Sequence, residues 1–554
     1  MDRFRIALAQ ANPLMGDIAG NLRKARAMRA DAAKAGADLI LFPELYIVGY
    51  PPEDLVLKPA LQQDAREAIE SLARDTIDAG PAVLIGAPWV DGSKLYNACL
   101  YLDRGSILGR TYKSDLPNYG VFDEKRVFAS GPLPGPFNIR GIRIGVPVCE
   151  DIWTPDVVEC LAETGAEILL VPNGSPFEAC KENVRLNLIV SRVKESGLPL
   201  VYLNQVGGQD ELVFDGASLV CNADARLAHA LPAWEEALVV TEWTRAENGW
   251  ICAKGELARE EDRDTSIYHA MMLGLRDYVN KNRFPGVVLG LSGGIDSALS
   301  AVVAVDALGP DRVRCVMLPS QYTSQDSLDD AAEVARLLGC NYETVPIEPA
   351  VDAFTHSLAN TFPGRAVDTT EENIQSRIRG LILMAISNKF GPMVLTTGNK
   401  SEMSVGYATL YGDMCGGFNV LKDVYKTEVF RLARWRNGNS PRNALGPKGR
   451  VMPENVISRP PSAELRADQK DEDSLPPYEI LDGILESLVE GEMSFEQVVA
   501  KGYEPAIVKR VEQLLYTSEY KRRQAPPGVK ITRRNFGRDR RYPITNAFRD
   551  ARDL

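Results

Sequence analysis

A chain of 554 residues is too long for one ordinary hydrophobic core, so we expect at least two domains. Apolar residues make up 45% of the chain and charged residues 25%, which is typical of a soluble globular protein. The net charge of -12 argues against a protein that binds nucleic acid or an anionic membrane surface. The basic segments 521–524 and 533–541 could bind phosphate or form a solvated tail.

Several further classes are excluded by what the chain lacks. No apolar run approaches a membrane span, and the N-terminus lacks a secretory apolar region, so we expect a cytoplasmic protein. The nine cysteines are scattered without a C-x-x-C pair, which predicts neither a disulfide framework nor a zinc site. None of the three histidines lies in a metal or nucleophile motif. Any hydrolytic chemistry must therefore work without the usual histidine base.

The N-terminal half alternates predicted strands and helices, and three chemically interesting side chains follow its strands or loops. Predicted strands cover residues 4–9, 37–42, 80–90, 95–102, 140–148 and 200–204, and helices cover 21–35 and 184–195. Glu44 follows the second strand, Cys149 follows the fifth, and Lys113 lies in the Gly- and Pro-rich loop 109–126. Each residue alone also has a non-functional interpretation. Glu44 could be an acidic residue at the end of a strand, Cys149 a thiol packed in the core, and Lys113 a solvated surface residue.

Together, Glu44, Lys113 and Cys149 suggest nucleophilic catalysis. A glutamate with a raised pKa can take the proton of a thiol, and an ammonium group can stabilise the oxyanion that forms. The stretches FPEL, YKSDLPNYGVFDEKR and CEDIW, within residues 3–250, resemble the nitrilase/amidase superfamily. The resemblance implies an α-β-β-α sandwich in which Glu124 orients the lysine. It also implies that Tyr119, Ser175 and Lys181 hold a glutamine substrate.

The stretch VVLGLSGGIDSALSAVV, residues 287–303, predicts a buried strand, a tight turn and a helix. Two glycines at such a turn let the backbone approach a ligand, and the helix N-terminus suits phosphate. Asp296 suggests Mg²⁺ that bridges to phosphate oxygens. The stretch fits neither a Walker loop nor the dinucleotide motif G-x-G-x-x-G. SGGIDS instead resembles the pyrophosphate loop of the ATP pyrophosphatase family, which cleaves ATP between its α and β phosphates.

The rest of the C-terminal half repeats a strand–helix pattern. Strands are predicted over 312–319, 342–347 and 393–397, and helices over 265–281, 327–338, 371–390, 478–498 and 505–516. This βαβ series predicts a doubly wound parallel sheet. We expect an amidase-like domain over 1–245, a linker over 246–264, and a nucleotide-binding domain over 265–554. The polar segment 437–477 is predicted to be a mobile loop.

The combination of both halves resembles the glutamine-dependent NAD synthetases, on the motifs ENIQSRIRG, TTGNKSE, YGD and KRRQ. The resemblance implies an ATP-dependent ligase that forms a C–N bond, converting deamido-NAD, ATP and glutamine (or ammonia) to NAD, AMP and pyrophosphate. An adenylylated intermediate and ammonia passed between two sites are implied, as is a homo-oligomer that binds small molecules rather than nucleic acid or membranes.

The same resemblance implies the residues of the synthetase site. ATP would contact Gly290, Leu291, Ser292, Gly293, Gly294, Ile295, Asp296, Ser297, Thr397 and Lys426. Deamido-NAD would contact Asn373, Arg377, Glu402 and Lys521, and Mg²⁺ would bind Asp296 and Glu402. Leu410 stands where single-domain members usually have lysine, so the deamido-NAD site is expected to differ there.

Two rival interpretations remain open. The same two sites could serve another amidotransferase of the ATP pyrophosphatase family, although ENIQSRIRG and KRRQ weigh against this. Alternatively, the amidase-like half could be a scaffold, with free ammonia as the nitrogen donor. The joint presence of Glu44, Lys113 and Cys149 argues against the scaffold.

Overall fold

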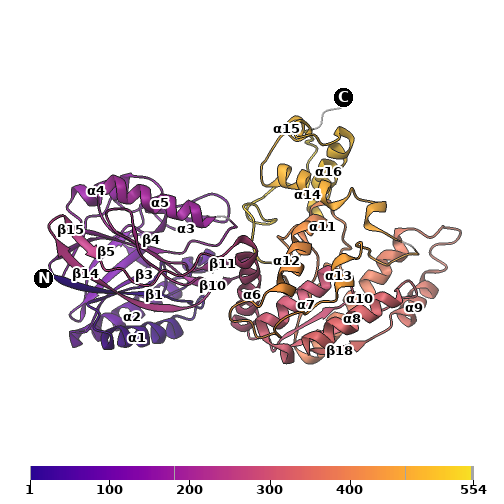
Figure 1. Cartoon of the computed structure of the whole chain (residues 1–554), viewed down its shortest axis with the longest axis horizontal. Coiled ribbons are helices and arrows are strands. Elements are labelled where there is room, and N and C mark those ends of the chain that lie inside the picture. Colours follow the sequence, from indigo (N-terminus) through magenta and orange to yellow (C-terminus); the bar gives the residue numbers. More distant parts are fainter. Residues whose placement is uncertain (1, 180, 468, 551–554) are drawn as a thin grey trace. The chain divides into compact units, whose positions relative to one another are not determined.

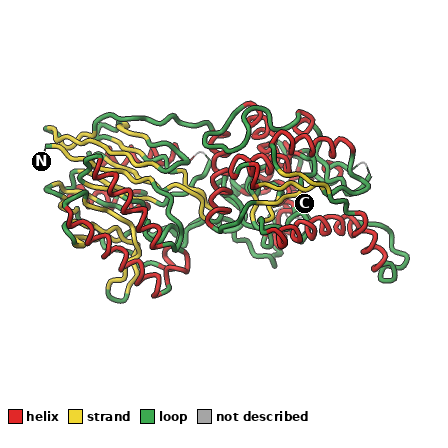
Figure 2. The backbone as a smooth tube through the Cα atoms, turned by 90° about the horizontal axis from the view of Figure 1, so that it is seen from below, coloured by secondary structure: helices red, strands yellow, loops and turns green. Residues whose placement is uncertain are grey.

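The computed structural model describes residues 2–179, 181–467 and 469–550 (Figure 1). The chain divides into two compact units, Met1–Glu261 and Asp262–Leu554, which we call unit 1 and unit 2. Figure 2 shows that strands form the interior of each unit and that helices lie around them. Each unit is described by itself.

Unit 1 contains two large sheets. The first has seven strands in the order β15-β14-β1-β2-β3-β4-β5, and the second has six in the order β13-β12-β9-β8-β7-β6. The strands of the first sheet are β1 (Arg3–Gln10), β2 (Leu39–Leu41), β3 (Ala82–Asp91), β4 (Lys94–Asp103), β5 (Ser106–Tyr112), β14 (Ala237–Ala246) and β15 (Gly249–Cys252). Those of the second are β6 (Phe137–Ile139), β7 (Ile142–Gly145), β8 (Ile168–Asn173), β9 (Leu200–Asn204), β12 (Leu219–Cys221) and β13 (Leu227–Ala230). A small hairpin joins β10 (Val206–Gln209) to β11 (Leu212–Asp215).

The two sheets pack face to face around an apolar core to which both contribute, for example Leu8 and Leu170. Helices cover the outer faces: α1 (Ile18–Lys34) and α2 (Pro59–Asp75) on the first sheet, and α4 (Asp156–Glu163) and α5 (Lys181–Ser196) on the second. Short helical turns are η1 (Glu53–Leu57), η2 (Thr76–Asp78), α3 (Glu124–Val127) and η3 (Cys149–Ile152). The α-β-β-α sandwich expected from the sequence is confirmed.

Two local expectations for unit 1 are corrected by the structure. The expected linker 246–264 contains β15, which pairs with β14 at the edge of the first sheet, and unit 1 extends to Glu261. This strand has only four residues and follows a mostly polar stretch, so it did not stand out from the predicted linker. The loop 109–126 begins inside β5 and ends in α3, so its two ends are ordered by strand pairing and by a helical turn.

Unit 2 is built on a five-stranded sheet in the order β18-β17-β16-β19-β20, and all its strand pairs are parallel. Its strands are β16 (Val287–Gly290), β17 (Val313–Met317), β18 (Asn341–Thr344), β19 (Met393–Thr396) and β20 (Phe418–Asn419). The chain order reverses between the neighbours β16 and β19. In open parallel sheets, ligands bind beyond the carboxyl ends of strands at such a reversal.

Helices surround this sheet, as expected for a doubly wound fold. They are α6 (Arg263–Lys281), α7 (Ile295–Leu308), η4 (Pro310–Arg312), α8 (Gln325–Leu338), α9 (Glu348–Leu358), α10 (Thr369–Phe390), α11 (Lys400–Val405) and α12 (Lys426–Gly438). Pro349 lies in the first turn of helix α9, a position that proline favours. None of the residues of this helix is buried, so its apolar pattern was too weak to predict it.

The C-terminal part of unit 2 is a helical cluster, drawn in yellow in Figure 1. It contains α14 (Tyr478–Val489), α15 (Phe495–Ala500), α16 (Pro505–Thr517) and α17 (Glu519–Arg522), and it buries Leu481 and Val508 against residues of α11. The sequence predicted a single helix over 478–498, but Glu490 to Ser494 separate α14 from α15, and Glu492 among them has a φ of 48°. Helix α13 (Glu454–Ser458) and η5 (Asp471–Asp473) lie in the predicted loop 437–477.

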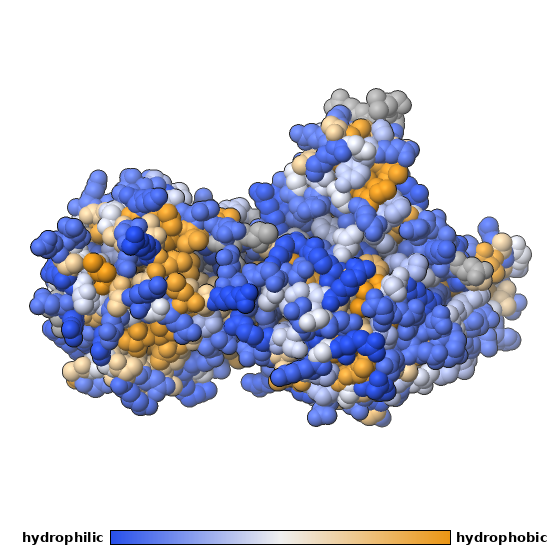
Figure 3. All heavy atoms as spheres, viewed as in Figure 1, coloured by the Kyte–Doolittle hydropathy of each residue, from blue (hydrophilic) through white to orange (hydrophobic). Residues whose placement is uncertain are grey.

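On the face shown in Figure 3, hydrophilic side chains cover most of unit 2. Within the described residues, no helix combines the length and apolar character that crossing a bilayer requires.

Candidate active sites

The unit 1 site is centred on a lysine that is held between two carboxylates. Lys113 Nζ donates to Glu44 Oε1 at 2.7 Å and to Glu124 Oε1 at 2.8 Å, and the lysine side chain has 0% of its surface exposed. Burial by itself lowers the pKa of Lys113, but the charges of Glu124 and Glu44 outweigh it and raise that pKa well above its usual value. The lysine therefore stays an ammonium group.

Both carboxylates are fixed by further donors. Asn97 Nδ2 donates to Glu44 Oε1 at 2.7 Å, and the backbone N–H of Gly174 donates to Glu44 Oε2 at 2.9 Å. Tyr50 Oη donates to Glu124 Oε1 at 2.8 Å. Burial raises the pKa of Glu124, against the charge of Lys113. Glu124 thus shares Lys113 with Glu44, and Glu44 also accepts hydrogen bonds from Asn97 and the backbone of Gly174.

Cys149 begins the turn η3 after the second sheet's strand β7, with a φ of 48°. A non-glycine residue in the left-handed region is uncommon and is often found at functional sites. Its thiol is buried, and burial together with the negative charge of Glu44 raises its pKa well above the usual value. The thiol is therefore neutral at rest and needs a base during attack.

Asp151 ties the cysteine turn to the lysine loop. One of its carboxylate oxygens accepts the N–H groups of Ser114 and Asp115 at 2.9 and 2.8 Å, and the other accepts the N–H of Val148 at 2.8 Å. Burial raises the pKa of Asp151 from 3.8 to about 7. This carboxylate spans the residues that immediately follow Lys113 and immediately precede Cys149, and the sequence analysis had not singled it out.

The residues expected to hold glutamine surround this site in different ways. Tyr119 is 54% exposed and donates from Oη to Glu150 Oε1 at 2.9 Å, beside Cys149 in sequence. Ser175 is buried, and Arg185, which is itself paired with Asp215 at 2.7 Å, donates to its hydroxyl and carbonyl oxygens. Lys181 Nζ donates to the carbonyl of Pro176 at 3.4 Å. Tyr119 is thus exposed and Lys181 partly exposed, whereas Ser175 is buried and held by Arg185.

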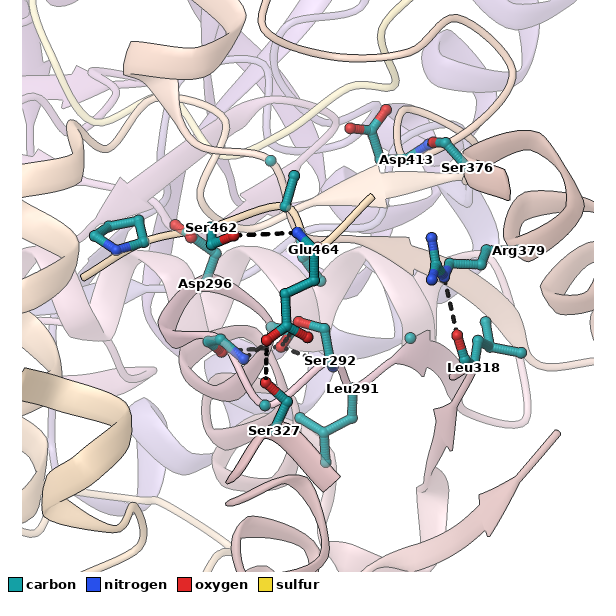
Figure 4. A pocket seen from close by; sticks show the side chains of 18 of the residues that line it. Leu291, Ser292, Asp296, Leu318, Ser327, Ser376, Arg379, Asp413, Ser462 and Glu464 are labelled. Atoms are coloured by element: carbon teal, nitrogen blue, oxygen red, sulfur yellow. Dashed lines mark hydrogen bonds between the residues drawn. The ribbon is translucent and has the colours of Figure 1, made fainter. Parts of the chain in front are cut away.

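The unit 2 site is a cavity of about 290 Å³ at the carboxyl ends of β16 and β19 (Figure 4). Every residue from Gly290 to Ser297 lines it, as do Thr397, Glu402 and Lys426. This agrees with the position expected at the reversal of strand order. The residues that the sequence predicts to contact ATP therefore line one cavity.

The SGGIDS turn is shaped by its own hydroxyl groups and by close packing. Ser297 Oγ accepts the N–H of Ser292 at 3.1 Å and donates to the carbonyl of Gly294 at 3.0 Å. Gly293 has a φ of 83°, and a Cβ there would lie 2.3 Å from the carbonyl oxygen of Ser327 in α8. Glycine is required at this position because a side chain would meet backbone atoms. The turn leads directly into the N-terminus of α7, where phosphate is favoured.

Lys426 joins the two carboxylates predicted to bind Mg²⁺. Its Nζ pairs with Asp296 and lies 3.2 Å from Glu402 Oε1, while Asn399 Nδ2 donates to Asp296 at 2.9 Å. Burial raises the pKa of Glu402 to about 8, and Lys426 opposes this shift. Within the described residues, no group of three or more His, Cys, Asp and Glu side chains is arranged to hold a metal. Two carboxylates still suit Mg²⁺, which usually takes one or two of them together with substrate phosphates.

The predicted loop 437–477 closes one side of this cavity. Glu464 Oε1 accepts from Ser327 Oγ at 2.8 Å, from Ser324 Oγ at 2.9 Å and from Arg459 at 2.7 Å, as Figure 4 shows for Ser327. The lining also includes Ser462 and Asp471 from this segment. These side chains could not be predicted to line a site because their segment has no regular apolar periodicity.

Three of the four residues predicted to contact deamido-NAD are not among those lining the cavity. They hold the loop 406–413 instead: Asn373 accepts from Thr409 Oγ1 at 2.9 Å, and Lys521 donates to the carbonyls of Gly406 and Ala408 at 2.7 Å. Arg377 donates to the carbonyl of Leu410 at 3.1 Å. Gly412 and Asp413 at the end of this loop do line the cavity, as does Arg379. Leu410, which stands where single-domain members usually have lysine, lies in this loop, and its carbonyl accepts the hydrogen bond from Arg377.

Comparison with known proteins matches both halves of the chain. The carbon-nitrogen hydrolase family model matches residues 5–249, and the NAD synthase model matches residues 267–525. The chain is 54% identical over 549 residues to the glutamine-dependent NAD(+) synthetase of Rhodobacter capsulatus, covering 99% of each chain. It belongs to the glutamine-dependent NAD(+) synthetases. The corresponding proteins of two Xylella fastidiosa strains are 47% identical, with 99% of each chain covered.

Solved structures of this family agree with the fold. The glutamine-dependent NAD+ synthetase of Acinetobacter baumannii, solved in complex with ADP, is 43% identical with a TM-score of 0.79, over 99% of this chain and 100% of that one. The enzyme from Cytophaga hutchinsonii, 22% identical with a TM-score of 0.83 over 98% of each chain, shares the fold. The chain is therefore a ligase of NAD biosynthesis, with a nitrilase-like glutaminase domain and an NAD synthase domain, and its family uses ATP as a substrate.

Proposed function

We propose that this chain amidates the nicotinate carboxylate of deamido-NAD through two half-reactions at separate sites. The observation that carries the proposal is the presence, in one chain, of the buried Glu44–Lys113–Glu124 cluster beside Cys149 and of the SGGIDS cavity in unit 2. A carboxylate does not react with ammonia in water, so one site must activate it while the other supplies unprotonated ammonia.

In the glutaminase half-reaction, Glu44 takes the proton of Cys149 as the sulfur attacks the side-chain carbonyl of glutamine. The raised pKa of the Cys149 thiol makes this transfer part of the attack rather than a prior step. Lys113, kept charged by its two carboxylates, stabilises the oxyanion. Glu44 then gives this proton to the amide nitrogen, the C–N bond breaks, ammonia leaves and a thioester to Cys149 remains. Water that has given its proton to Glu44 then releases glutamate and the free thiol.

Tyr119, Ser175 and Lys181 are proposed to bind the glutamine backbone. Their support is chemical: a hydroxyl, a fixed loop residue and an ammonium group suit the α-amino and α-carboxylate groups of an amino acid. The bonds of Arg185 to Ser175 keep that loop in place before the substrate arrives. Glu124 is proposed to act through Lys113, because its carboxylate accepts hydrogen bonds from that lysine, Asn97 and Tyr50.

In the synthetase half-reaction, the loop 290–297 is proposed to bind the phosphates of ATP, with Thr397 and Lys426 beside it. The nicotinate carboxylate attacks the α-phosphorus, pyrophosphate leaves and an adenylylated carboxylate forms. This step depends mainly on positioning and charge neutralisation. Asp296 and Glu402 would hold Mg²⁺, which neutralises phosphate charge when bound, and Lys426 would then be free to contact a phosphate oxygen. Ammonia attacks the adenylate to give the amide and AMP.

Glu402 lines the cavity and is proposed to contact deamido-NAD directly. Asn373, Arg377 and Lys521 are proposed to serve the same substrate by holding the loop 406–413, whose last residues reach the cavity. A sealed route for ammonia and assembly into a homo-oligomer remain predictions of the family resemblance.

The deciding experiment supplies purified protein with deamido-NAD, ATP, Mg²⁺ and glutamine, and measures NAD and glutamate together. We expect NAD to form, and a glutamate-to-NAD ratio near one would indicate that ammonia does not escape. Absence of NAD formation with either glutamine or ammonia would refute the proposed acceptor. A panel of other carboxylate substrates would then identify the alternative amidotransferase.

A further inference from the structure

Two cysteines of unit 2 that neither half-reaction uses lie in direct sulfur contact. Cys315 is in the middle of β17, and Cys340 follows the glycine that ends α8. Their Sγ atoms are 3.6 Å apart. In the parallel ladder Cys315 is opposite Tyr342, two residues beyond Cys340, so strand pairing holds the two thiols together.

The two thiols have different surroundings. Cys315 is 0% exposed, whereas Cys340 is partly exposed. Their mutual hydrogen bond, reinforced by burial, raises the pKa of Cys315 well above its usual value, and the same bond lowers the pKa of Cys340. Either thiol can donate in this contact, and the partly exposed Cys340 is the one that an external reagent can reach.

We propose that Cys315 and Cys340 form a reversible oxidation site, at which a peroxide converts the two thiols into an intramolecular disulfide. The Cys340 thiolate attacks a peroxide oxygen, the O–O bond breaks, and the cysteine becomes a sulfenic acid while the leaving oxygen takes a proton. The sulfur of Cys315 then attacks the sulfenic sulfur and releases water. The two thiols together lose two electrons and two protons, which reduce the peroxide.

The approach needed is small. A disulfide bond is about 2.0 Å long, so the sulfur atoms must close by roughly 1.6 Å from their contact of 3.6 Å. Side-chain rotation supplies movements of this size without changing the backbone. The mutual contact distinguishes this pair from Cys221 and Cys252, whose thiols donate to the carbonyls of Asn222 and Ala253 at 3.6 and 3.5 Å.

The disulfide would join the C-terminal end of α8 to β17, two elements that flank the SGGIDS turn. Ser327 at the start of α8 packs against Gly293, and Val316 and Met317 directly after Cys315 line the cavity. The cross-link constrains the unfolded chain between residues 315 and 340, so the oxidised protein should melt at a higher temperature than the reduced one.

The test treats the full-length Cys149→Ala protein with hydrogen peroxide, alkylates the remaining thiols, digests without reduction and analyses the peptides by mass spectrometry. Removing the Cys149 thiol avoids oxidation of the predicted nucleophile. Trypsin cuts after Arg314, Arg336 and Arg365, so the two cysteines lie on separate peptides. We expect one linked pair, two hydrogens lighter than the sum, that a thiol reductant separates. Cys221 and Cys252 serve as internal controls and should stay alkylated.

Two variants separate the chemical steps. In Cys315→Ser, Cys340 should be trapped as a sulfenic acid by a 1,3-diketone probe, whereas in Cys340→Ser the buried Cys315 should stay reduced. The proposal is overturned if both cysteines remain alkylated at peroxide concentrations that oxidise Cys221 or Cys252. It is also overturned if the linked protein melts at the temperature of the reduced protein, since the tether between α8 and β17 would then be without effect.

Discussion

Asp151→Asn tests whether the glutaminase site depends on the carboxylate that joins its two loops. The asparagine side chain has nearly the same shape but only one oxygen. In one orientation its NH2 group faces the N–H of Val148, and in the other it faces those of Ser114 and Asp115. Donor then faces donor, and each unpaired buried group costs about 1–3 kcal/mol.

We expect this conflict to move the turn that carries Cys149 relative to Lys113. A displacement of about 1 Å can reduce the rate of a positioned reaction by about 10²-fold. Glutamine hydrolysis by Asp151→Asn should therefore fall by about that factor in kcat, with a small change in KM for glutamine. Ammonia-driven NAD formation should be retained, because unit 2 contains the residues proposed for that reaction.

The pH profile supplies a second measurement on the same variant. The pKa of Asp151 is raised from 3.8 to about 7, so the folded state binds a proton more tightly than the unfolded state does. Its contribution to the free energy of unfolding is therefore present at low pH and is lost as pH rises through this window. The ionised form, which accepts all three N–H groups, predominates above about pH 7, so glutaminase activity should rise across that pH. Asp151→Asn should lack both effects.

Glutamate release, ammonia-driven NAD formation and thermal melting are measured on each protein. Asp38→Asn is the matched control, because Asp38 also accepts a backbone N–H, that of Arg5 at 2.8 Å, and pairs with Arg140. Glutaminase activity of Asp151→Asn within threefold of the unsubstituted protein would refute the reasoning. An equal loss of glutaminase activity in Asp38→Asn would show that Asp151 only contributes to stability. Equal losses of glutamine-driven and ammonia-driven synthesis in Asp151→Asn would show the same.

Four further substitutions probe the two sites. Cys149→Ala should abolish glutamine-driven synthesis and leave ammonia-driven synthesis largely intact; equal loss of both in NAD assays would contradict separate sites. Lys113→Met leaves two buried carboxylates without their cation, so chemical denaturation should show a loss of about 3–5 kcal/mol together with loss of glutamate release; unchanged stability would contradict the role of the buried pair. Gly293→Ala forces a side chain onto the carbonyl of Ser327, and its ammonia-driven rate should fall at least tenfold with a raised KM for ATP; normal ATP kinetics would count against the loop. Asp296→Ala should abolish synthesis from either nitrogen donor, and retained ammonia-driven turnover would show that the carboxylate is dispensable.

Much of the fold could be predicted because its signals are local. Short apolar runs typical of strands alternate with segments of helical periodicity, and turns rich in glycine and acidic residues lie between them. Glu44, Cys149 and the SGGIDS turn were visible because each comes within four residues of the end of an apolar strand, near the edge of a sheet. Helix α9 was missed because it has no buried residues, and strand β15 because it is only four residues long and follows a mostly polar stretch.

The residues of the candidate sites likewise fall into those that local sequence could predict and those that depend on distant contacts. Types of residue and their order along the chain were enough to nominate Glu44, Lys113 and Cys149, and to connect SGGIDS with ATP. The contacts of Asn373, Arg377 and Lys521 could not be foreseen, because each depends on where the distant loop 406–413 lies. The same holds for Asp151, whose three donors come from two segments more than 30 residues apart.

The sequence by itself determined the two-part organisation, the parallel sheet and the chemical groups available at each strand end, since these follow from local pattern and residue type. Only the tertiary structure decided which charges are paired and which positions are buried. Lys113 stays charged because it is buried against Glu44 and Glu124, and Lys426 lies between Asp296 and Glu402. Burial and charge pairing set these ionisation states, and both depend on contacts between residues that are remote in the chain.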